Sequence, residues 1–239
     1  MSMATSAIRM VTAGCAAVTL ALGLAGCSGD DGATADRDAT YTTAALKAGV
    51  LEPADVGTSW KRPEQQPPTT TLTPLCPGVP TRPPIPGTPG VIAAALADEG
   101  DKGAQAFDQM GLAYADAPAM EAAFTKLQDA MEACPPSATR SAGPREESSE
   151  AGYTETSTIE PLESGGWKGF VTLRHKVYEP TYPGSADIAV AVVGRGNAVV
   201  VASYAVYWVG EHSTGPEFDT DWRRMVGTVL SRTDAKRAK

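Results

Sequence analysis

Short apolar segments separated by polar turns recur along the second half of the chain and predict β-strands. Six such segments are recognisable, at residues 91–97, 104–115, 152–162, 168–179, 187–193 and 198–208. Val199, Val200 and Val201 run together in the last one, which favours a central strand covered on both faces. The residues Gly194-Arg195-Gly196-Asn197 predict a tight hairpin between the last two strands, and the polar residues 137–150 predict an exposed loop.

Apolar residues at helical spacing predict helices before, between and after these strands. A short helix is expected near residues 41–50, and a longer one from about residue 118 to 134. The last helix begins near Thr214, and its apolar stripe consists of Phe218, Trp222, Met225, Val226 and Val229. The order α-β-β-α-β-β-β-β-α contains consecutive hairpins. It predicts an α+β fold with a central antiparallel sheet of about six strands, packed by two or three helices.

The N-terminal region has the pattern of a bacterial lipoprotein signal. Arg9 precedes an uncharged stretch that ends in Leu24-Ala25-Gly26-Cys27, which resembles a lipobox. We therefore expect residues 1–26 to be removed and Cys27 to carry lipid at the outer face of the cytoplasmic membrane. The alternative, an uncleaved membrane helix, fits less well because the apolar run is short and rich in Gly, Ala and Thr. Residues 27–40 are small and polar and predict a flexible tether.

A folded domain is expected at residues 41–232, followed by a basic tail at 233–239. Residues 61–90, the proline-rich loop, contain ten prolines in thirty residues and exclude regular helix or a central strand. After loss of Cys15 with the signal and lipidation of Cys27, Cys76 and Cys134 are the two remaining thiols. An oxidising compartment favours a disulfide between them, which would pin the loop to the domain.

Charge and motifs exclude several functions. The net charge of −8 argues against nucleic-acid binding. The sequence contains no zinc-site spacing, no calcium loop and no serine-hydrolase elbow, so we expect no metal, no cofactor and no enzyme activity. His175 shares the strand face of Val171, Leu173 and Val177, which predicts a hydrogen-bonded group in the packed interior.

Four aromatic residues are the candidates for a ligand site. Tyr204 and Trp208 share one strand face, and Phe124 and Trp222 lie on the two long helices expected to pack nearby. We expect these rings to line a cleft for a small apolar ligand, with a plain hydrophobic core as the alternative.

Several of these features together resemble the actinobacterial lipoproteins of the PknH-like extracellular sensor-domain family. They are the lipobox, the phrase Leu51-Glu52-Pro53-Ala54-Asp55-Val56-Gly57, the two cysteines, the Gly196-Asn197 hairpin and the C-terminal helix. The resemblance covers residues 41–231 and implies an antiparallel sheet with two helices that border a cleft for a small ligand. Kinase-linked members carry two disulfides, whereas this domain can form one, and no kinase domain is present.

The sequence therefore predicts a membrane-anchored module that binds a small ligand or an envelope protein. One alternative is a cell-envelope hydrolase that uses unrecognised carboxylates, which would need two of them facing each other across a cleft. The other is a purely structural envelope lipoprotein, which would need no cleft.

The anchor can be tested by Cys27→Ala. Because the thiol of Cys27 is the group that accepts lipid, the variant should incorporate no labelled fatty acid and should escape the lipoprotein-specific peptidase. Metabolic labelling and the apparent mass of the chain measure both effects. A processed, lipid-labelled variant in the membrane fraction would contradict the assignment.

Overall fold

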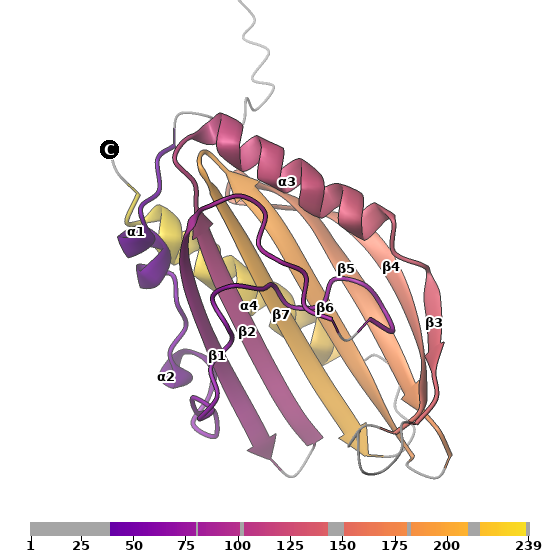
Figure 1. Cartoon of the computed structure of the whole chain (residues 1–239). Coiled ribbons are helices and arrows are strands. Elements are labelled where there is room, and N and C mark those ends of the chain that lie inside the picture. The colour runs from indigo at the N-terminus through magenta and orange to yellow at the C-terminus, as the bar shows by residue number, and fades with distance from the viewer. Residues whose placement is uncertain are drawn as a thin grey trace, which may run out of the picture. The chain divides into compact units, whose positions relative to one another are not determined.

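The computed structural model describes residues 39–79, 81–100, 103–142, 151–180, 183–209 and 216–237. In this part of the chain, seven strands form one antiparallel sheet and four helices pack against it (Figure 1). The elements in chain order are α1 (Thr43–Ala48), α2 (Pro53–Val56), β1 (Gly90–Gly100), β2 (Gly103–Ala113), α3 (Ala117–Glu132), β3 (Ser137–Arg140), β4 (Tyr153–Ser164), β5 (Trp167–Tyr178), β6 (Gly184–Arg195), β7 (Ala198–Val209) and α4 (Pro216–Asp234).

The strand order across the sheet is β1-β2-β7-β6-β5-β4-β3. The predicted α+β class and the antiparallel sheet are confirmed, and the six expected strands are all present. The seventh, β3, lies where the sequence predicted only a loop. It pairs with β4 from Ser137 opposite Thr156 to Arg140 opposite Tyr153. Four residues are too few to show an alternating pattern, and this pairing comes from the neighbouring strand rather than from local preference.

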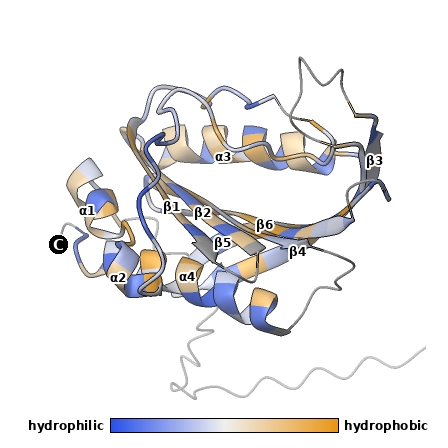
Figure 2. Ribbon diagram, turned by 90° about the horizontal axis from the view of Figure 1, so that it is seen from below, coloured by the Kyte–Doolittle hydropathy of each residue, from blue (hydrophilic) through white to orange (hydrophobic). Residues whose placement is uncertain are grey.

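The helices divide between the two faces of the sheet (Figure 2). Helices α1, α2 and α4 cover one face, and α3 covers part of the other. The central strands β6 and β7 are buried on both faces, as the run of valines in β7 predicted: Val200 packs toward α4, while Val199 and Val201 pack toward α3. The sheet therefore separates two hydrophobic cores.

The core beneath α4 contains the largest buried rings, including Phe107, Trp167 and Trp222. The predicted apolar stripe of the last helix is confirmed, since all five of its residues are buried there. On the other face, the carboxylate of Asp116 accepts a hydrogen bond from the backbone N–H of Ala119 at 2.8 Å and caps α3. Met120, Leu127 and Met131 of α3 are buried against the sheet.

The β6–β7 hairpin joins three distant parts of the chain through Asn197. Its side-chain oxygen accepts from the backbone N–H of Tyr41 at 2.6 Å, and its amide nitrogen donates to the carbonyls of Tyr41 and Tyr114. Gly196 has a φ of +57°, and a Cβ there would lie 1.8 Å from the carbonyl oxygen of Ala39. The Gly-Asn pair is therefore required by both the turn and the contacts around it.

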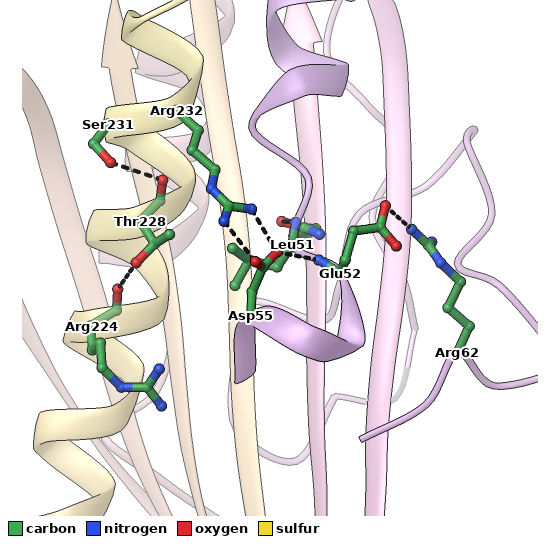
Figure 3. Close-up of polar contacts among 9 residues, drawn as sticks. Leu51, Glu52, Asp55, Arg62, Arg224, Thr228, Ser231 and Arg232 are labelled. Carbon is green, nitrogen blue, oxygen red and sulfur yellow. Dashed lines mark hydrogen bonds and ion pairs between the residues drawn. The ribbon is translucent and has the colours of Figure 1, made fainter. Parts of the chain in front are cut away.

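The phrase at residues 51–57 forms α2 and its attachment to α4 (Figure 3). Asp55 accepts a hydrogen bond from the backbone N–H of Glu52 and two from the guanidinium of Arg232, at 2.6 and 2.7 Å. Arg62 in turn donates to Glu52. The hydrogen bonds from Arg232, and then that from the backbone of Glu52, lower the pKa of Asp55 from 3.8 to about 2. This motif thus fixes the N-terminal segment to the C-terminal end of α4.

Asp55→Asn should destabilise the domain by about 1 kcal/mol at pH 7, because Arg232 remains partly exposed to solvent. The pKa of the native carboxyl is depressed, so its contribution is present above pH 4 and is lost as pH falls from about 4 toward 2. The difference from the wild type should shrink over that range in denaturant titrations. Asp221→Asn is the matched control, since Asp221 pairs with Arg224 on the surface of α4, and should change stability little. A pH-independent difference would contradict this account.

Candidate functional site

The proline-rich loop lies against the α3 face of the sheet, and a disulfide attaches it there. Cys76 and Cys134 are bonded with their Cα atoms 5.2 Å apart, as the sequence predicted. Leu72 and Leu75 of the same loop are buried in the core beneath α3. The loop therefore covers the part of this sheet face that α3 does not cover.

A buried ion pair holds the loop on both sides of the disulfide. The carboxylate of Glu155 on β4 lies 2.7 Å from both Nε and Nη2 of Arg174 on β5. Arg174 also donates to the carbonyl of Pro74 at 3.0 Å, and the backbone N–H of Gly78 donates to Glu155 at 2.7 Å. The Glu155 side chain is 0% exposed and that of Arg174 8%. Such a pair is stable only when its hydrogen bonds are satisfied, and here the loop backbone satisfies them.

Next to this ion pair, a cavity of about 220 Å³ remains between the loop and the sheet. We call it the loop cleft. Four loop residues line it, among them Thr73 and Arg82. Ala106 and Asp108 line it from β2, and the rest of the lining comes from β3 to β7. The cleft exists because α3 covers one end of this face and the loop crosses the other without filling it.

Basic side chains converge on the loop cleft. Four cations line it, Arg82, Arg140, Arg174 and Lys176, and one carboxylate, that of Asp108. Lys176 is 6% exposed, and its Nζ lies 3.9 Å from the centre of the Tyr153 ring. The cleft is thus cationic in a chain that carries a net charge of −8.

Asp108 lies on the opposite wall of the cleft from β5. Burial raises its pKa, while Arg82 and a hydrogen bond with Thr73 act in the opposite direction. At the edge of the cleft, Val79 is 44% exposed and Tyr207 38%. The cleft therefore combines a charged interior with an apolar, solvent-accessible rim.

A second cavity, of about 350 Å³, lies on the other face near the start of α4. His175 lines it, and its Nδ1 lies 2.7 Å from the buried carboxylate of Asp187. The predicted hydrogen-bonded role of His175 is confirmed, although the ring stays partly exposed. The other lining side chains include Leu173 and Phe218, so fewer charged groups converge here, and the loop cleft is the stronger candidate.

The four aromatic candidates do not line one cleft. Tyr204, Trp208 and Trp222 belong to the α4 side of the sheet, whereas Phe124 packs on Phe170 on the opposite side. The expected cleft between Phe124 and Trp222 is therefore wrong, because α3 and α4 cover different faces (Figure 2). Tyr204 stacks on Phe218 with ring centroids 5.6 Å apart, and its hydroxyl donates to Gln105. Burial raises the pKa of Tyr204.

The residues of the loop cleft were missed by sequence reasoning for a physical reason. On β5 the sequence predicts that the face of Val171, Leu173 and Val177 is packed, and it makes no prediction for the alternate face. At the end of the strand, Val177 is exposed, while Arg174 and Lys176 are buried under the loop. The available signal was two basic residues at alternate positions, close to a loop that the disulfide brings to the sheet.

The remaining expectations concern the lipid anchor, metal binding and membrane-spanning helices. Cys27 and the signal segment lie outside them, so the lipid anchor stays a prediction. Within the described part of the chain, no cluster of three or more His, Cys, Asp or Glu side chains could hold a metal ion. None of the helices described has the length and apolar character of a membrane span.

The chain is similar in structure to the extracellular domain of PknH from Mycobacterium tuberculosis, known from its crystal structure. The TM-score is 0.51 at 16% sequence identity, over 82% of this chain and 98% of that one. No protein-family model and no curated protein matches the chain. The domain thus shares its fold with that extracellular domain, as the resemblance implied.

Glu155→Gln should destabilise the domain by about 3 to 5 kcal/mol, because it leaves the buried guanidinium of Arg174 without its counter-charge. Denaturant titration measures the loss, and limited proteolysis should cut the proline-rich loop sooner. The double variant Glu155→Leu/Arg174→Met is the matched control and should lose less, since no charge remains buried. Equal stability of Glu155→Gln and wild type would show that the pair does not hold the loop.

Proposed function

We propose that this protein is a membrane-anchored extracytoplasmic lipoprotein whose domain binds a small ligand in the loop cleft. The observation that carries the proposal is the cleft itself, on which buried charged side chains converge beneath a loop held by the Cys76–Cys134 disulfide. Binding sites combine a preformed concavity with a few convergent polar groups, and the loop cleft has both.

Two further observations support this function. The fold is shared with the extracellular domain of PknH, which fits a module that works outside the cytoplasm. The lipobox ending at Cys27 supplies the anchor, and the disulfide fits an oxidising compartment. On this proposal, the tether at residues 27–40 holds the domain close to the outer face of the cytoplasmic membrane.

The two alternative functions have less support. A hydrolase of the expected kind needs two carboxylates facing each other across the cleft. Of the described residues that line the loop cleft, Asp108 is the one carboxylate. Glu155 on β4 lies next to the cleft, but its carboxylate is paired with Arg174. A purely structural lipoprotein needs no cleft, whereas this domain has one that is lined by four cations.

The proposal can be tested by filling the cleft. Ala106 lines it on β2, and Ala106→Trp should occupy its volume. The full chain purified from its own membranes should retain a small molecule in native mass spectrometry, and the variant should lose it.

Ala104→Trp is the matched control, because Ala104 lies two residues earlier on the same face of β2 and is exposed. It should retain the molecule as the wild type does. Equal retention by both tryptophan variants would place the ligand elsewhere, and a wild-type chain with no bound molecule would favour the structural role.

A further inference from the structure

The charge of the loop cleft is opposite to that of the chain as a whole. Overall, 28 acidic residues outnumber 20 basic ones, yet the cleft is lined by four basic side chains and one acidic one. They come from three separate regions: Arg82 from the loop, Arg140 from β3, and Arg174 with Lys176 from β5. The fold, rather than a run of basic sequence, brings these charges together.

The position of these cations makes them effective toward an anion. A cleft lined by charges of one sign, with walls of low dielectric, focuses the electric field and raises the local concentration of the opposite charge. Arg174 and Lys176 lie at the buried base, where attraction between charges is least screened by water. Guanidinium groups also match carboxylate and phosphate oxygens in geometry.

The guanidinium of Arg174 is already fixed in direction before any ligand arrives. Glu155 holds Nε and Nη2, and the carbonyl of Pro74 holds Nη1. A rigid charged group loses little side-chain entropy when a ligand binds near it, so such an arrangement favours affinity. Lys176 is similarly placed by its contact with the Tyr153 ring.

The size and rim of the cleft restrict the ligand further. A cavity of about 220 Å³ is small for a whole metabolite but fits one charged head group. Val79 and Tyr207 at the rim offer apolar surface beside the charged base. A ligand with a charged group and a short apolar part would satisfy both regions.

We infer that the loop cleft binds the carboxylate or phosphate group of a small organic anion, with the apolar part of that ligand against Val79 and Tyr207. This inference rests on the proposed function and adds the chemical class of the ligand. It replaces the uncharged, apolar ligand that the aromatic residues predicted.

The test uses calorimetric titration of the full chain in maltoside micelles with four probes: hexyl phosphate, hexanoate, inorganic phosphate and hexanol. At least one anion should bind, more weakly as salt rises, and hexanol should bind at least tenfold more weakly than that anion. Binding of inorganic phosphate as tight as that of hexyl phosphate would assign the site to the free ion and remove the role of the rim. Comparison of hexyl phosphate with hexanoate separates the two head groups.

Lys176→Met keeps the length of the side chain and removes its charge, so it should weaken anion binding at least tenfold. Lys168→Met is the matched control on the same strand, because Lys168 is partly exposed and pairs with Glu163 away from the cleft. Arg140→Gln should also weaken binding, and it provides a second measure if near-ultraviolet circular dichroism shows that Lys176→Met alters the fold.

Three results would overturn the inference: no binding of any anion, binding of hexanol as tight as that of the anions, or equal weakening by Lys168→Met and Lys176→Met. An uncharged molecule retained by the wild type and lost in Ala106→Trp would keep the proposed function while overturning the anion. Anion binding that Ala106→Trp leaves unchanged would instead show that the loop cleft is not the site.

Discussion

The buried ion pair between Glu155 and Arg174 is the contact on which the loop and the cleft depend. A segment with ten prolines lacks the donors to form a regular ladder of its own, so its position must be set by groups outside it. The pair supplies an acceptor for Gly78 and a donor for Pro74, and the disulfide of Cys76 lies between those two contacts. Three attachments within five residues therefore hold the loop at a fixed height above the sheet.

The cleft follows from the unequal covering of the two sheet faces. On one face, α1, α2 and α4 bury a continuous core, with large rings such as Trp167 and Trp222 at its centre. On the other, one helix of 16 residues must cover seven strands, and it reaches only part of them. The proline-rich loop covers much of the remainder with Leu72 and Leu75 but cannot interdigitate as a helix does. The helix and the loop together therefore leave the loop cleft unfilled on this face.

The sequence predicted the fold better than the site, and the difference has a physical origin. Strand alternation and helical stripes are local, so the six long strands and the stripe of α4 followed from them. The cleft depends on which face each helix covers and on side chains from six strands and a loop, and none of this is encoded in local spacing. Phe124 and Trp222 each occupied a helix stripe, as expected, but the stripes face opposite cores. Val177 lies on the face predicted to be packed, yet α4 does not reach it.

The burial of charge at the loop cleft bears on whether its role is structural alone. A buried ion pair is no more stabilising than apolar side chains of similar volume, and often less, because both charges lose their hydration. A loop could be held by apolar contacts like those of Leu72 and Leu75, which lie in the same segment. Arg174 and Glu155 hold the loop through Pro74 and Gly78. With Lys176 beside them, they also give the base of the cleft a positive charge that apolar packing would not supply, and this charge suits an anionic ligand.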